Sequence, residues 1–188
     1  MSAAEKLTLT HDEYLALEAK SVEKHQYLRG EVWAMAGGTP EHGRLQANLI
    51  REIGNALGTR PCALFTSDVR VRVDATDRTT YPDLFVVCGP RSTSPVDPNA
   101  ITNPLIVVEV LSDGTELDDR GEKFAHYRHL ASLEEYVLVS QRARRLEVFR
   151  RTADGWILSE AGPGEHARLR SIDALLAVDA VYRDPAAG

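Results

Sequence analysis

The 188-residue sequence contains few cysteines, only Cys62 and Cys88. There is no CxxC pair and no Cys/His spacing typical of zinc sites, so the sequence does not predict a structural zinc module. Each cysteine lies within a short apolar run. We therefore expect two reduced, buried thiols in a cytosolic protein.

Long apolar runs are also missing from the sequence. No uncharged apolar stretch approaches the roughly 18 residues of a membrane span, and the N-terminal residues 1–6 lack the basic and apolar regions of a signal peptide. These absences predict a soluble, cytoplasmic protein that makes no membrane contact.

Positive charge is scarce, since 22 Lys and Arg face 28 Asp and Glu and give a net charge of −6. This balance argues against indiscriminate coating of nucleic acid, which needs clustered cations. It leaves room for a nucleic-acid enzyme whose acidic site is filled by a divalent metal. The 43% hydrophobic and 27% charged content is that of an ordinary globular protein.

The length and the absence of repeats or linkers predict one domain over residues 1–188. Alternation and helical spacing predict an α/β fold with a central mixed sheet flanked by helices. We expect an N-terminal helix and β-hairpin at about 10–36, a core at about 41–150, and C-terminal strands and a helix at about 151–180. Within these parts the expected helices cover 41–57, 117–130 and 171–176, and the expected strands include 62–74, 81–88, 104–111, 135–139, 146–150 and 156–159.

Local signals support several of these elements. Thr10 followed by Glu13 is typical of a capping box at a helix start, and Gly30 is placed to turn a hairpin. In the segment 62–74, valines alternate with charged residues, which predicts one strand with a solvent-facing side that carries Arg70 and Arg72.

Two carboxylates interrupt strands that otherwise read as buried. Asp83 follows Pro82 in the run 81–88, and Glu109 stands in the middle of the apolar run 104–111. A carboxylate in such a strand is costly to desolvate unless a cation or hydrogen bonds meet it. If the strands are neighbours, Mg²⁺ between Asp83, Glu109 and the Val110 backbone carbonyl would satisfy both acids. The alternative is that Asp83 caps a turn and Glu109 forms a buried salt bridge.

Lys123 lies on the helix that follows the Glu109 strand. Asp119, Lys123 and Tyr127 are four residues apart and share a helix face. The simplest interpretation is a surface Asp–Lys pair. However, the helix returns directly from the Glu109 strand, so Lys123 can also lie over the strand end that carries Asp83.

These motifs, in this order, resemble the Uma-type family of predicted restriction endonucleases, within the PD-(D/E)XK nuclease superfamily. The resemblance rests on Pro82-Asp83, Glu109-Val110-Leu111-Ser112, Asp119-x3-Lys123-x3-Tyr127 and 135–139, and it covers roughly residues 10 to 150. It implies a restriction-endonuclease-like core that hydrolyses phosphodiester bonds of DNA with Mg²⁺ or Mn²⁺. Asp83 and Glu109 would match the metal-binding acids and Lys123 the cationic catalytic group.

The sequence departs from the superfamily's plain motif at one position. The lysine usually found two residues after the glutamate is replaced by Leu111, and in the Uma-type pattern its role moves to the next helix, at Lys123. The resemblance also suggests Glu31, His42 and Tyr127 as accessory residues. The residues themselves favour the simpler alternatives, in which Glu31 is an exposed hairpin residue and His42 makes a local helix-cap contact.

Arginines provide the candidate contacts for a nucleic-acid backbone. We expect these contacts from Arg70, Arg72, Arg142, Arg144 and Arg145. The equally supported alternative is that these charges protect exposed sheet edges from association.

A second functional hypothesis is a catalytically inactive module that keeps the nuclease fold and binds or regulates nucleic acid. Leu111 and the net charge of −6 favour this alternative. An unrelated hydrolase has little support, because the sequence contains no Gly-x-Ser-x-Gly elbow and no P-loop. By analogy, an enzyme that cuts both strands of a duplex predicts a homodimer.

Overall fold

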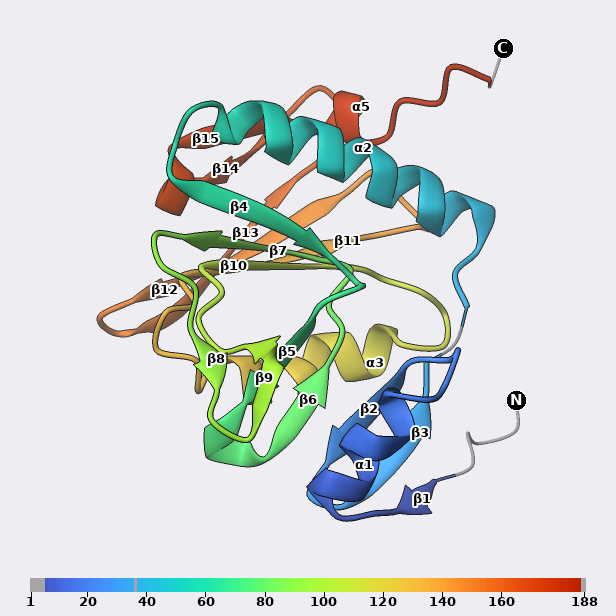
Figure 1. Cartoon of the computed structure of the whole chain (residues 1–188). Helices are drawn as coiled ribbons and strands as arrows, with labels where there is room; N and C mark the ends of the chain where they lie inside the picture. Colours follow the sequence, from blue (N-terminus) through green and yellow to red (C-terminus); the bar gives the residue numbers. More distant parts are fainter. Residues whose placement is uncertain (1–5, 36, 187–188) are drawn as a thin grey trace.

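The computed structural model describes residues 6–35 and 37–186. A six-stranded mixed sheet lies at the centre, with strands in the order β13–β12–β11–β10–β7–β4 (Figure 1). Only the pair β10 and β11 within this sheet is parallel. The strands are β4 (Cys62–Thr66), β7 (Leu84–Cys88), β10 (Ile106–Val110), β11 (Glu135–Val139), β12 (Leu146–Thr152) and β13 (Gly155–Ala161).

A second sheet of seven short strands lies beside the first and is ordered β1–β3–β2–β6–β5–β9–β8. It joins the N-terminal hairpin to the middle of the chain through the pairing of β2 with β6. Its strands are β1 (Leu7–Thr8), β2 (His25–Leu28), β3 (Glu31–Ala34), β5 (Arg70–Val73), β6 (Arg78–Thr80), β8 (Thr93–Ser94) and β9 (Asp97–Ile101).

One face of the central sheet is covered by the long helix α2 (Pro40–Leu57). Leu45, Leu49 and Ile53 recur at helical spacing and are fully buried in this core. The hairpin of β14 (His166–Leu169) and β15 (Ala174–Ala177), with the short helix α5 (Val178–Val181), packs into the same layer (Figure 1). This layer holds the end of the chain against α2.

The opposite face of the central sheet packs against a helical segment and part of the second sheet. The segment consists of α3 (Glu116–Asp118), a π-helical turn (Asp119–Lys123) and α4 (Phe124–Tyr127). Figure 1 shows it between the central sheet and the N-terminal hairpin. The segment thereby links the two sheets.

Several predicted elements are confirmed. Helix α1 (His11–Glu18) has the capping box formed by Thr10 and Glu13, and β2 and β3 form a hairpin around Gly30. Ala36, the last residue of the predicted hairpin segment, lies outside the described residues. Across the described part of the chain, no helix has the length and apolar character needed to cross a bilayer.

The prediction of a single strand over 62–74 is wrong. The chain turns after Thr66, where the Val69 amide donates to the Thr66 carbonyl (3.1 Å), and β4 and β5 belong to different sheets. The predicted solvent face is also wrong for Arg72, which is only 5% exposed. Its guanidinium is buried because Asp74 and Asp77 neutralise it at 2.9 and 2.6 Å.

Other parts of the chain also differ from the sequence predictions. Two short strands that the sequence did not predict, β8 and β9, lie between β7 and β10. The predicted helix 171–176 is instead a 3-10 turn (Arg170–Ile172) followed by β15. Asp173 between them has a φ of 44°, a left-handed conformation that ends a helix and lets the chain fold back as a hairpin. The predicted helix 117–130 is also less regular than expected, because the π-helical turn divides it.

The expectation of reduced thiols is wrong as well. Cys62 and Cys88 are register partners on the antiparallel strands β4 and β7, and the structure joins them in a disulfide. The sequence offered no sign of this pairing, because it depends on which strands are neighbours. The cysteines therefore no longer support a cytosolic location.

We predict that this bond is present in protein purified without reductant. Under denaturing conditions no thiol should react with a thiol-specific reagent until reductant is added, and reduction should lower the unfolding free energy by roughly 3–4 kcal/mol. The variant Cys62→Ala/Cys88→Ala should be insensitive to reductant. Two reactive thiols in the unreduced protein would contradict the disulfide.

Candidate active site

The two carboxylates that interrupt the apolar strands meet at one end of the β7–β10 pair. Asp83 immediately precedes β7 and Glu109 lies near the end of β10. The Asp83 amide donates to Glu109 Oε2 (3.3 Å), and the Val110 amide donates to Asp83 Oδ2 (2.7 Å). The side chain of each acid is thus bonded to the strand that carries the other.

Glu109 is the more buried of the two acids, with only 2% of its surface exposed. The Tyr127 hydroxyl donates to its Oε1 at 3.0 Å, and Lys123 Nζ lies 3.4 Å from the same oxygen. Burial raises the pKa of Glu109 to about 8, although the charge of Lys123 acts in the opposite direction. The protein's own groups therefore compensate the negative charge only in part.

Lys123 is almost completely buried, and its ammonium lies 2.6 Å from Asp119 Oδ1. Burial by itself lowers the pKa of Lys123, but Glu109 and Asp119 outweigh it, so the pKa lies above the usual lysine value. The Lys123 ammonium is therefore a permanent positive charge beside Glu109. The interpretation of Asp119 and Lys123 as a surface pair is wrong, since both side chains are buried.

Asp119 is the site residue that sequence reasoning did not include among its candidates. Its four-residue spacing from Lys123 was visible, but not its burial. The structure buries it because the π-helical turn faces the central sheet, where the Tyr136 hydroxyl donates to the Asp119 carbonyl (2.8 Å). π-helical turns are rare and often occur at functional sites.

His42 approaches the acids from the first turn of α2. Thr39 caps this helix by accepting from the His42 amide (3.1 Å), and His42 Nε2 lies 3.2 Å from Asp83 Oδ2. This contact raises the pKa of His42 above its usual value, although partial burial acts against it. One turn later, Gln46 donates to the Asp83 carbonyl (3.0 Å), so α2 holds Asp83 through two side chains.

A cleft of about 920 Å³ lies between the N-terminal hairpin, α2 and the helical segment after β10, and its lining includes His42, Gln46, Asp83, Glu109, Asp119 and Lys123. Val110 also lines the cleft. Glu31 lies at its rim, where it is exposed and pairs with Lys6 at 2.5 Å. Acidic side chains predominate in the lining, which comprises Glu23, Glu31, Asp83, Glu109, Asp118, Asp119 and Glu122 against Lys6, Lys24 and Lys123.

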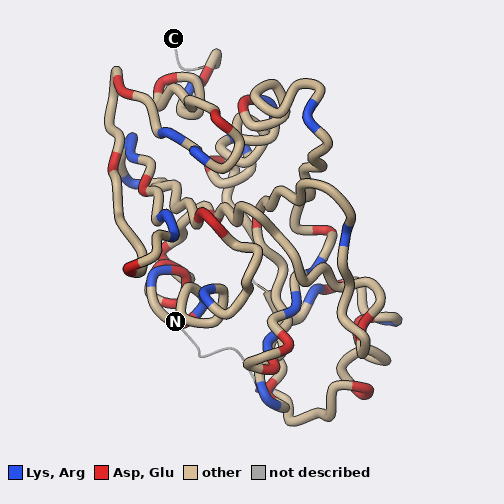
Figure 2. Tube along the Cα trace, turned by 90° about the vertical axis from the view of Figure 1, so that its left-hand side faces the viewer, with Lys and Arg blue, Asp and Glu red and all other residues tan. Residues whose placement is uncertain are grey.

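The five arginines expected to contact nucleic acid do not line this cleft. Figure 2 shows acidic and basic residues interspersed along the chain, and each of the five has a carboxylate partner. Arg70 pairs with the buried Asp97, and the buried Arg72 pairs with Asp74 and Asp77, which are partly exposed. The other pairs are Arg142–Asp113, Arg144–Asp179 and Arg145–Glu147. Nucleic-acid contact by these residues stays a prediction.

The donor set limits which metal the cleft can take. Within residues 6–35 and 37–186, no three His, Cys, Asp or Glu side chains are grouped so as to hold a metal ion. Zn²⁺ sites ordinarily need three or four such side chains. Mg²⁺ is commonly bound by one or two carboxylates, with waters and phosphate oxygens as the other ligands. Asp83, Glu109 and the Val110 carbonyl fit the second pattern.

Comparison with known proteins adds a family match and a fold match. The Uma2 family model, described as "Putative restriction endonuclease", matches residues 11–178. Two proteins of Synechocystis sp. are similar in sequence: "Uncharacterized protein slr1290" is 36% identical over 176 residues, covering 93% of this chain and 92% of that protein. "Uncharacterized protein sll1609" is 34% identical over 162 residues, covering 86% and 91%.

A crystal structure of "a putative nuclease belonging to DUF820" from Anabaena variabilis shares the fold. It aligns with a TM-score of 0.75 over 93% of this chain and 97% of that chain. The sequences are 17% identical. This likeness confirms the nuclease-like fold that the sequence predicted.

The pKa of Glu109 predicts how stability depends on pH. Between its usual value of 4.5 and about 8, the folded protein holds a proton on Glu109 that the unfolded chain has lost. In EDTA, the stability of the wild type should therefore fall relative to Glu109→Gln as pH rises through this window. Each pKa unit is worth about 1.4 kcal/mol, so the loss is at most several kcal/mol.

Denaturant unfolding at pH 5 to 8 measures this effect. The matched control is Glu160→Gln, the same chemical change at an exposed position, which should run parallel to the wild type. A constant stability difference between wild type and Glu109→Gln across this range would contradict the raised pKa.

Proposed function

The chain belongs to the Uma2 family, and from this membership we propose that it is a divalent-metal-dependent endonuclease that hydrolyses phosphodiester bonds of DNA. The observation that carries the proposal is the meeting of Asp83 and Glu109 from neighbouring strands, with Lys123 beside Glu109. Two acids and a cation in one cleft are the minimum that the family resemblance requires.

Mg²⁺ or Mn²⁺ is the cofactor that the site would take, held by Asp83, Glu109 and the Val110 carbonyl. The partly compensated charge of Glu109 supports this, because a divalent cation would favour the ionised form. When bound, such a metal supplies a water of lowered pKa and stabilises charge on a phosphoryl oxygen. It would also offset the acidic lining that otherwise repels a polyanion.

The protein's own residues hold the reacting groups in place. Tyr127 keeps its proton, since burial and Glu109 raise its pKa well above the usual value, and its hydroxyl fixes Glu109. Lys123 presents a fixed positive charge that can stabilise developing negative charge on the phosphate. His42 and Gln46 fix Asp83 from α2. Glu31 stands further out, as an accessory residue at the rim of the cleft.

The alternative function is an inactive module that binds or regulates nucleic acid with the same fold. The burial of Lys123 between Glu109 and Asp119 favours it, because an ammonium already paired with two carboxylates is less available to a phosphate. Cleavage and metal binding separate the two functions. Three further predictions apply to either function. They are a homodimer, a cytoplasmic location and contacts between the five arginines and the nucleic-acid backbone.

We expect the purified protein to cleave supercoiled plasmid DNA in Mg²⁺ or Mn²⁺ and not in EDTA. Asp83→Ala, Glu109→Ala and Lys123→Ala should each lower the rate by about 10²–10³ or more, because each removes an electrostatic group from the reacting centre. The measurement is the initial rate of nicking and linearisation on agarose gels.

Matched controls are the exposed substitutions Asp154→Ala and Lys20→Ala, which should cleave at the wild-type rate. Circular dichroism checks the fold, and calorimetry with Mn²⁺ should show binding that Asp83→Ala abolishes. Cleavage that persists in all three site variants would contradict the site. Mn²⁺ binding without cleavage would support the inactive module.

A further inference from the structure

A second cavity, of about 240 Å³, lies between β12, β13 and the β14–β15 hairpin. It shares no lining residue with the acidic cleft. Val148 and Ala167 at this cavity belong to the core on the α2 face of the central sheet, whereas Asp119 and Lys123 of the cleft come from the helical segment that packs on the opposite face. The two cavities are therefore separate sites.

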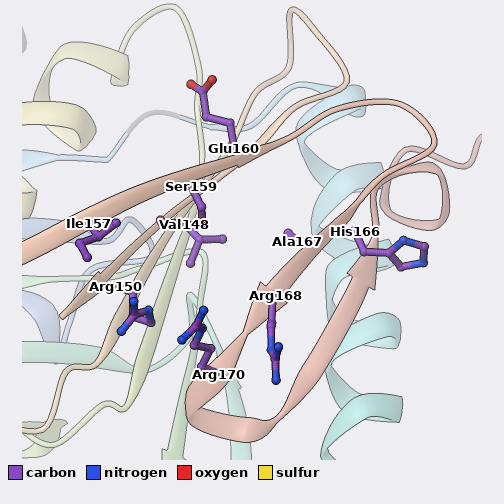
Figure 3. Close-up of a pocket in the computed structure, with 9 residues that line it drawn as sticks. All are labelled: Val148, Arg150, Ile157, Ser159, Glu160, His166, Ala167, Arg168 and Arg170. Atoms are coloured by element: carbon purple, nitrogen blue, oxygen red, sulfur yellow. Dashed lines mark hydrogen bonds between the residues drawn. The ribbon is translucent and has the colours of Figure 1, made fainter. Parts of the chain in front are cut away.

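Three arginines line this small cavity, namely Arg150, Arg168 and Arg170. Figure 3 shows the head groups of Arg150 and Arg170 near one another, with Arg168 extending from β14 to the right of them, while Glu160 and His166 point away from all three. The arginines come from β12, from β14 and from the turn after β14. Arg168 and Arg170 are exposed and Arg150 is half-buried, and an anion that lay between the three would be attracted by each of them.

These guanidinium groups have few partners inside the protein. Arg150 is half-buried, yet in the described part of the chain neither its side chain nor that of Arg170 makes an ion pair or hydrogen bond. Arg168 lies 3.6 Å from Asp173, and both of these side chains are largely exposed. Exposed pairs of this kind are weak, so Arg168 can exchange its partner for a ligand.

A buried carboxylate fixes the position of Arg170. Glu135 is fully buried and accepts from the amides of Arg170 (2.7 Å) and Ser171 (3.3 Å) and from the Ser171 hydroxyl. Glu135 and Arg150 are register partners on β11 and β12, so their side chains lie on the same face of the sheet. The Glu135 oxygens are taken by these donors, and the backbone of Arg170 is held close to Arg150.

We infer that this pocket is a binding site for a phosphate group. Guanidinium forks match phosphate oxygens two at a time, and three of them suit a multiply charged oxyanion better than a carboxylate. The volume is below the roughly 300–1,000 Å³ of pockets that enclose a drug-sized ligand. The pocket therefore fits the phosphate of a free anion or of a polynucleotide strand. This site does not depend on the proposed nuclease activity.

The test is NMR titration of the arginine Nε–Hε signals in EDTA, at constant ionic strength. The probes are inorganic phosphate, a short single-stranded DNA with a 5′-phosphate, and acetate. In the wild type we expect saturable shifts of the Arg150, Arg168 and Arg170 signals. In Arg150→Lys/Arg170→Lys, which keeps both charges but loses the guanidinium forks, the affinity reported by the remaining Arg168 signal should be about tenfold or more weaker. Exposed arginines provide the matched control pair, Arg91→Lys/Arg183→Lys, in which the same chemical change is made outside the pocket.

The outcomes distinguish the sources of the phosphate. Saturation by both phosphate and DNA supports a general phosphate site, and saturation by DNA alone that needs both arginines supports a strand phosphate as the ligand. The inference is overturned if neither probe saturates or if acetate binds as tightly. It is also overturned if binding survives in Arg150→Lys/Arg170→Lys or falls equally in the control pair. Circular dichroism of Arg150→Lys/Arg170→Lys confirms that it is folded.

Discussion

A carboxylate buried near the end of the central strand β10 is the constraint on which the site depends. Glu109 is flanked by apolar residues and almost excluded from solvent, so its charge must be met by neighbours. Tyr127 and Lys123 contact its carboxylate from the helical segment, and the amide of Asp83, just before β7, donates a hydrogen bond to it. These contacts bring three separate parts of the chain together at one point, and they leave the charge incompletely compensated.

The surrounding architecture places a cleft over that point. The second sheet carries the N-terminal hairpin across from α2, and the π-helical turn brings Asp119 and Lys123 between them. The lining is acidic overall, so a polyanionic substrate needs added positive charge before it can approach. In a metal-dependent nuclease, the bound cation lets an acidic cleft accept a phosphodiester substrate. For this reason the proposed function rests on the acids and not on the arginines.

Sequence reasoning located the acids but not all of their surroundings. Asp83, Glu109 and Lys123 were visible because a charge in an apolar run, or on a helix returning from one, violates a local pattern. Asp119 was missed because burial depends on how the helical segment packs. The break between β4 and β5, the hairpin at Asp173 and the Cys62–Cys88 pair were missed for the same reason. Strand pairing is a long-range property that alternation along one segment does not encode.

The most direct test of the central claim is a crystal structure of the protein with Mn²⁺, with data collected for anomalous scattering. We expect one anomalous peak within coordination distance of Asp83, Glu109 and the Val110 carbonyl, with the Lys123 ammonium beside it and not bound to it. An empty cleft at saturating Mn²⁺, or a peak held only by other residues, would contradict the assignment of these two acids as the metal site.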